Sequence, residues 1–235
     1  MGSGIQHDRL GGHGGFPDRL GRGSNGPDTR GSHPGKPAQH GIGGPLHLSH
    51  GADAGGAQRL RNTLLAAMGL AGYGTKKLPK GEGMGVACVS SQERATASWT
   101  ACVAHVAVDD SGEVKVKKLT VATDVGTQVN PDGIRAQVEG AALWGMSLAL
   151  FEKATMKDGA IEQSNFDSYT PMRMSQIPEV ALAVIANGEP ATGVGEPAVT
   201  VVAPALANAI YNAVGARVRS LPITAEAVKA GMKKA

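Results

Sequence analysis

Aromatic side chains are scarce in this 235-residue sequence. They make up 3% of it, while glycine occurs 34 times. The hydrophobic share is nonetheless 41%, which is ordinary for a protein with a globular core. We therefore expect one folded domain, diluted by a segment that does not fold.

Cysteine is scarce as well. Cys88 and Cys102 are the only two in the sequence. They are too few and too simply spaced for a disulfide framework, a CxxC metal site or a cysteine-ligated iron–sulfur cluster. We expect both to be small side chains buried in strands.

Long apolar runs and a strong charge are also missing. No run approaches the roughly 20 residues of a membrane helix, so we expect no membrane span. The first ten residues have no apolar core of a signal peptide, and the sequence does not fix a cellular location. The net charge of +3 is too small to favour a nucleic acid as partner.

The first 56 residues lack aliphatic periodicity and are rich in Gly, His, Arg, Pro and Asp. Residues 1–56 are therefore predicted to be disordered, and residues 57–235 to form the folded part. Other interpretations stay open: metal binding by the histidines, RNA binding, or a non-native, out-of-frame sequence. The histidines are His7, His13, His33, His40, His47 and His50.

After residue 57 the apolar pattern predicts a helix followed by a sheet. A break in alternation at Lys117–Lys118 predicts a β-bulge, and the lysines are expected on a solvated sheet face. His105 is expected to be a core histidine with a satisfied hydrogen bond. The expected elements are a helix that stops at Gly72 or Gly74 and strands over 84–90, 100–108 and 114–125, the last two joined by an Asp/Gly turn.

A second, long helix is predicted to begin at Asn130–Pro131, where an N-cap residue precedes proline. The helix extends to Phe151 and is apolar on nearly every side, so we expect it to be buried all round. Gly140 and Gly145 are expected where something packs closely against the backbone. Gln137 should then need a partner or a ligand.

The remaining elements follow from turn chemistry and short apolar runs. They are a hairpin turn at 156–160, a polar loop over 164–176, strands over 180–186 and 218–223, a helix over 198–214, and a last helix capped by Thr224.

A carboxylate between glycines and proline stands out at Gly193–Pro197. Two interpretations of Glu196 are open from the residues alone. It is an acid at a helix N-terminus, stabilised by the helix dipole, or it is a general base aimed at a ligand that the glycines let approach. Glu189 is a weaker candidate for the same role.

A family resemblance rests on six stretches: DVGTQVNP at 124–131, QVEG at 137–140, EQSNFD at 162–167, IANGEPATGVGEP at 185–197, APALANAI at 203–210 and RSLP at 219–222. In order and spacing they resemble the C-terminal end of the molybdopterin-binding large subunit of the xanthine oxidase and aldehyde oxidase family. Within it, they are most similar to isoquinoline 1-oxidoreductases and three-component bacterial aldehyde dehydrogenases.

In that family a metal-bound hydroxyl attacks an electron-poor carbon of an aldehyde or an aromatic N-heterocycle. The resemblance implies that Glu196 is the general base that takes the proton of this hydroxyl, and that Gln137 hydrogen-bonds the cofactor. Gly193, Val194 and Gly195 would lie against the same centre. The implied cofactor is molybdenum–molybdopterin cytosine dinucleotide, whose dithiolene holds the metal, so no protein ligand to the metal is expected.

The resemblance also implies an α+β fold of mixed sheets with packed helices. Family large subunits are several times longer, so we expect a fragment or split piece of a molybdenum hydroxylase. It would be inactive without the rest of that subunit and a small iron–sulfur subunit, with a cytochrome c subunit as a further partner left open. The alternative is a non-catalytic remnant that serves at most as a binding or structural module.

Overall fold

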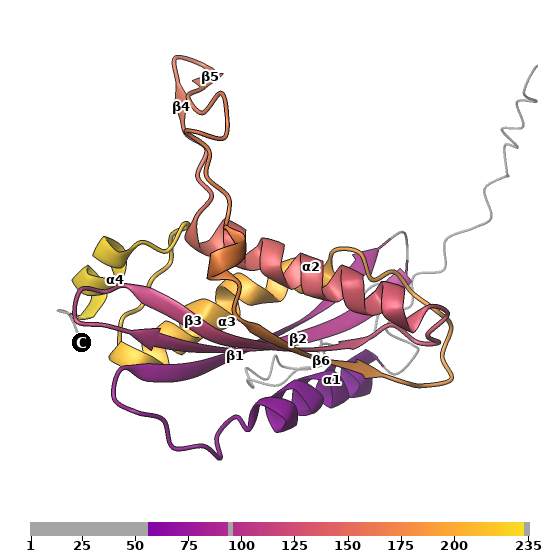
Figure 1. Cartoon of the computed structure of the whole chain (residues 1–235). Coiled ribbons are helices and arrows are strands. Elements are labelled where there is room, and N and C mark those ends of the chain that lie inside the picture. The colour runs from indigo at the N-terminus through magenta and orange to yellow at the C-terminus, as the bar shows by residue number, and fades with distance from the viewer. Residues whose placement is uncertain (1–55, 94–95, 233–235) are drawn as a thin grey trace, which may run out of the picture. The chain divides into compact units, whose positions relative to one another are not determined.

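The structure, a computed structural model, describes residues 56–93 and 96–232. The disorder predicted for residues 1–56 therefore falls almost wholly outside the described residues. A four-stranded sheet in the order β1-β2-β3-β6 forms the centre (Figure 1). Its first three strands are antiparallel, and β6 runs parallel to β3. The strands are β1 Glu82–Glu93, β2 Thr96–Val108, β3 Val114–Asp124 and β6 Glu179–Ile185.

Helices cover both faces of this sheet (Figure 1). Side chains alternate along β2: Ala101 and Val103 join the cluster beneath α1, whereas Cys102, Ala104 and Val106 join the cluster beneath α2 and α3. The mixed sheet with packed helices confirms the expected α+β class. The helices are α1 Gly56–Ala71, α2 Pro131–Leu150 and α3 Pro197–Val214.

The predicted β-bulge is present in β3. His105 pairs with Lys118 while Val106 pairs with Val116, so Lys117 is the extra residue. The bulge turns Lys117 toward Glu82 of β1, with 2.7 Å between Nζ and Oε1. His105 Nε2 lies 2.8 Å from the other oxygen of the same carboxylate, which confirms a satisfied histidine.

The buried side of α1 is not its leucine side. Arg59, Thr63 and Ala67 lie four residues apart along the buried stripe, whereas Leu65 and Leu70 are about half exposed. Small side chains let the helix approach the sheet closely, and this stripe places one arginine next to it.

Helix α2 begins as predicted, because the Asn130 side chain accepts a hydrogen bond from the Gly133 amide. The expectation of a helix buried all round is wrong, since Trp144 is 53% exposed. A Cβ added at Gly145 would lie 2.7 Å from the carbonyl oxygen of Val199, which confirms close packing there. Around Gly140, by contrast, a Cβ would meet nothing within 4 Å.

Helix α3 lies against β1 at a distance that only glycine allows. A Cβ at Gly85 would be 2.0 Å from the amide nitrogen of Ala209. The side-chain amides of Asn208 and Asn212 reach over the strand and donate to the carbonyl oxygens of Val86 and Met84. By length and composition α3 could cross a membrane, although no such run was expected from the sequence. Its packing in the core accounts for its apolar character.

The strand predicted over 218–223 is wrong. Val218 and Ile223 are buried in the main core, and the Ile223 amide donates to the Ala149 carbonyl of α2 and not to a strand. Cys88 is exposed, which contradicts its expected burial, whereas Cys102 is buried. The remaining elements are the hairpin β4 Met156–Lys157 and β5 Ala160–Ile161, the 3-10 turn η1 Met174–Gln176, and α4 Ala225–Met232, which Thr224 caps as predicted.

Candidate functional site

Two loops meet where the parallel strands β3 and β6 end. Because the strands are parallel, their carboxyl ends lie at one edge of the sheet, and the crossover between them includes α2. The loop over 125–130 leads into α2, and the loop over 186–196 leads into α3. In sheets of this kind, ligands bind outside the carboxyl ends of the strands.

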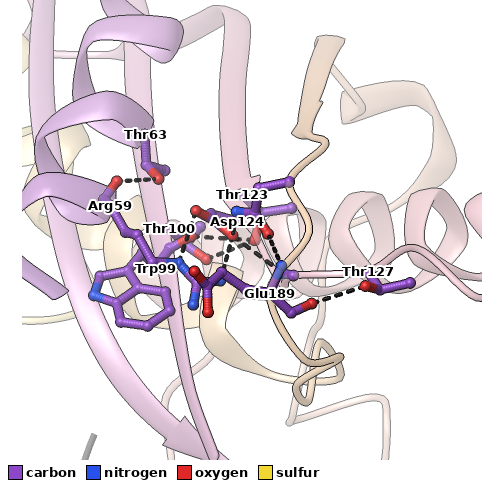
Figure 2. Close-up of polar contacts among 10 residues, drawn as sticks. Arg59, Thr63, Trp99, Thr100, Thr123, Asp124, Thr127 and Glu189 are labelled. Atoms are coloured by element: carbon purple, nitrogen blue, oxygen red, sulfur yellow. Dashed lines mark hydrogen bonds and ion pairs between the residues drawn. The ribbon is translucent and has the colours of Figure 1, made fainter. Parts of the chain in front are cut away.

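A buried ion pair anchors this edge (Figure 2). Arg59 of α1 donates to Asp124, the last residue of β3, through Nε at 3.0 Å and Nη2 at 2.6 Å. The guanidinium also stacks on the ring of Trp99, 3.9 Å from its centroid. The amide of Gly126 and the side chain of Asn187 donate to Oδ1 of the same carboxylate, at 3.1 and 2.8 Å. Asp124 therefore joins α1, β3 and both loops.

Two opposing effects act on the ionisation of Asp124. Burial raises the pKa of its carboxyl group. Hydrogen bonds from Arg59, Gly126 and Asn187, together with the charge of Arg59, lower the pKa by more, so the net shift is downward. The site therefore holds Asp124 as a carboxylate, the form that can accept all of these hydrogen bonds at once.

Backbone hydrogen bonds tie the two loops to each other. The amide and the hydroxyl of Thr127 both donate to the Glu189 carbonyl, each at 2.8 Å. The Thr192 amide donates to the Val125 carbonyl at 2.9 Å. Gly126 has a φ of 73°, and a Cβ there would lie 2.1 Å from the Pro190 carbonyl oxygen. Glycine is thus required where the loops cross.

A pocket of about 280 Å³ lies between these loops and the first turns of α2. Two residues implied by the resemblance, Gln137 and Val194, line the same pocket although they are far apart in sequence. Thr192 also lines it, and its hydroxyl is buried without a hydrogen-bond partner in the described structure. The pocket is thus lined by the exposed Gln137 and by a residue whose buried hydroxyl lacks a partner among the described residues.

Glu196 lies just beyond that pocket and does not line it. It is the N-cap residue of α3, but its side chain makes no capping hydrogen bond and is exposed. Gly193 is fixed to β2, because its amide donates to the Thr96 hydroxyl at 3.2 Å. The carboxylate of Glu196 is thus placed by a well-held loop, but residues 56–93 and 96–232 do not enclose it in a water-poor cleft.

Comparison with known proteins identifies the family. Residues 69–178 match the family model described as molybdopterin cofactor-binding domain. Membrane-bound aldehyde dehydrogenase (pyrroloquinoline-quinone) of Gluconacetobacter polyoxogenes is 43% identical over 76% of this chain. The isoquinoline 1-oxidoreductase beta subunit of Brevundimonas diminuta is 34% identical over 47%. The chain belongs to the molybdenum hydroxylase family.

The chain shares its fold with solved family members. Aldehyde oxidoreductase from Desulfovibrio gigas is 28% identical, with a TM-score of 0.52 over 59% of this chain and 16% of that one. The chain spans 23% of the length of the Gluconacetobacter relative and 14% of the Brevundimonas relative. Most of the length of these relatives thus has no counterpart in this chain.

Sequence reasoning missed the residues that hold the two loops of the candidate site together. Asp124 stands inside one of the matching stretches, yet only its place at the end of an apolar strand signalled a special role. Arg59 gave a weaker signal, a charge on the small-residue side of an apolar helix. Among the described residues, no group of His, Cys, Asp and Glu side chains could hold a metal ion.

Proposed function

We propose that this chain forms one wall of the cofactor site in a molybdenum hydroxylase that oxidises aldehydes or aromatic N-heterocycles. The observation that carries the proposal is that Gln137, Val194 and Thr192 line one pocket, and that the Thr192 hydroxyl has no hydrogen-bond partner among the described residues. Neutral amides and hydroxyls suit the hydrogen-bonding edge of a pterin. The residues present therefore fit molybdopterin, and the cytosine dinucleotide form is the one that the family resemblance implies.

When bound, the cofactor supplies the metal centre at which oxygen from water is added to the substrate carbon. In our proposal the Gln137 amide hydrogen-bonds the cofactor, and the backbone over Gly193–Gly195 lies against it. Glu196 accepts a proton as the general base. Its place at the start of α3 supports this role, because the hydrogen-bonded loop fixes the backbone from which the carboxylate projects.

In our proposal the complete activity requires further polypeptide in addition to this chain. The pocket of about 280 Å³ is slightly smaller than the range of about 300–1,000 Å³ for small-molecule sites, and Glu196 is exposed. We infer that the rest of a large subunit covers both. Electrons would leave through a small iron–sulfur subunit, with a cytochrome c subunit as a further carrier.

A reconstituted enzyme tests this function. The chain is co-produced with the part of the Gluconacetobacter relative outside the matching region and with an iron–sulfur subunit. Molybdenum is measured by elemental analysis, and oxidation of an aldehyde and of an N-heterocycle is followed with a dye as electron acceptor. Glu196→Gln should abolish turnover at unchanged molybdenum content. Loss of molybdenum in that variant would instead make Glu196 a structural residue.

The non-catalytic alternative is favoured by one observation, the exposure of Glu196 at a helix N-terminus. Under this alternative, no combination of subunits that includes this chain should contain bound molybdenum or oxidise the substrates. Because the name of the first relative includes pyrroloquinoline quinone, the same preparation is analysed for that quinone. Quinone in place of molybdenum would refute the proposed cofactor.

A further inference from the structure

One face of α2 is left uncovered between residues 137 and 144 by the described part of the chain. Gln137, Gly140 and Trp144 follow one another at a spacing of three and four residues, so they share one side of the helix. All three are exposed. We call this side the α2 stripe. Its first residue lines the proposed cofactor pocket, and its last lines a second, larger hollow.

Gly140 is the residue in this stripe that the described structure does not explain. Glycine is unfavourable inside a helix, so it is retained where a side chain would be in the way. Gly145 in the same helix has such a reason, because Val199 packs on it. A Cβ at Gly140 would meet nothing within 4 Å. The space that it leaves is thus available to something outside the described residues.

The hollow at the Trp144 end has a volume of about 470 Å³ and is mostly apolar. Phe166 is 68% exposed at its rim and Met174 is 84% exposed. Clustered exposed aromatic and methionine side chains are typical of protein interfaces and infrequent on free surfaces. The hollow therefore suits an apolar side chain from another polypeptide segment.

We propose that the α2 stripe and this hollow form the docking surface for the rest of a molybdenum hydroxylase large subunit. An apolar side chain fills the hollow, and the backbone of the same segment packs on Gly140. The relatives carry several times this chain's length, which makes such a segment the occupant to expect. Because the stripe begins at Gln137, docking also closes the cofactor pocket. This inference rests on the proposed function.

Two glycine substitutions test the docking surface. At Gly140 an added Cβ would meet nothing within 4 Å among the described residues, and the same holds at Gly69 of α1, on the opposite face of the sheet, so the test compares Gly140→Leu with Gly69→Leu. Both replace an exposed helical glycine, so both should keep or raise the melting temperature. The tagged full chain is co-produced with the non-matching part of the Gluconacetobacter relative, and affinity is measured by titration of the purified partners.

We expect the unmodified chain and Gly69→Leu to bind alike, and Gly140→Leu to bind at least about tenfold more weakly. Trp144→Ser should weaken binding similarly. Equal binding by Gly140→Leu, or no binding by the unmodified chain, would overturn the docking surface. Two other outcomes would also overturn the proposal. If the unmodified chain self-associates and Gly140→Leu does not, the α2 stripe binds a second copy of the chain. If the chain binds only the iron–sulfur subunit, the α2 stripe is the contact surface for that subunit.

The two proposals fail in different ways. A stable complex that depends on Gly140 but holds no molybdenum would leave the docking surface standing and refute the function. A complex that holds molybdenum and turns over equally well with Gly140→Leu would keep the function and refute the docking surface.

Discussion

Replacing Asp124 by asparagine should be among the most destabilising conservative changes in this chain. The substitution keeps the shape of the side chain and removes its charge. Arg59, whose side chain is 10% exposed, would then remain beneath the sheet without a counterion. Removing one partner of a buried ion pair costs about 3–5 kcal/mol, because the other charge stays buried and unpaired. We expect the free energy of unfolding to fall by that amount.

An exposed ion pair in the same sheet provides the matched control. Lys118 and Glu179 join β3 to β6 at 2.7 Å, almost the separation of the buried pair, but the Glu179 side chain is 66% exposed. Glu179→Gln should therefore cost at most about 1 kcal/mol. Both variants are compared by urea unfolding followed by far-ultraviolet circular dichroism, with equal m-values required.

A double variant separates the ion pair from other effects. Arg59→Met with Asp124→Asn removes both charges, so its loss of stability should be smaller than the sum of the two single losses. A loss below about 1 kcal/mol for Asp124→Asn alone would refute the reasoning, because it would mean that water solvates Arg59 in the folded protein.

The same residue predicts a pH dependence. The pKa of Asp124 is lower in the folded chain than its ordinary value. Its contribution to stability is therefore complete above the unfolded pKa of about 4 and is lost as the pH falls through the folded pKa. The stability difference between the unmodified chain and Asp124→Asn should be constant near neutral pH and shrink below about pH 4. A difference that grows in acid would contradict the direction of the shift.

Three further experiments test the buried thiol, the two loops and the cap of α2. Burial raises the pKa of Cys102 to about 12, so iodoacetamide should label exposed Cys88 in the native protein and Cys102 only after unfolding, as mass spectrometry of peptides will measure. Gly126→Ala forces a Cβ against Pro190 at positive φ, and it should lower the melting temperature and speed hydrogen exchange in both loops. Asn130→Ala removes the cap of α2 and should cost about 1 kcal/mol in urea unfolding, with unchanged labelling of Cys102.

Local features of this fold were predictable from the sequence because near neighbours decide them. The cap at Asn130 needs only a side chain three residues before an amide. The bulge at Lys117 follows from one break in alternation. The resemblance added the family. It also placed Gln137 and the glycine loop in one site, and Gln137 and Val194 of that loop do line one pocket. Their chemical roles, and that of Glu196, stay predictions.

Other features depend on contacts between residues that are far apart in the sequence, and these contacts could not be predicted. The segment ending at Ile223 has the composition of a strand, but the Ile223 amide bonds to the helix α2. Helix α2 is apolar nearly all round, yet only the packing of α3 reveals which side stays open, and with it the α2 stripe.

By itself, the sequence determined the class of fold, most element boundaries and the family. Only the tertiary structure decided that Arg59 and Asp124 meet, and that their contact fixes the two loops around the pocket. The physical reason is that a helix or turn is selected by bonds between residues a few positions apart. A buried ion pair forms only when the whole sheet has brought distant segments together.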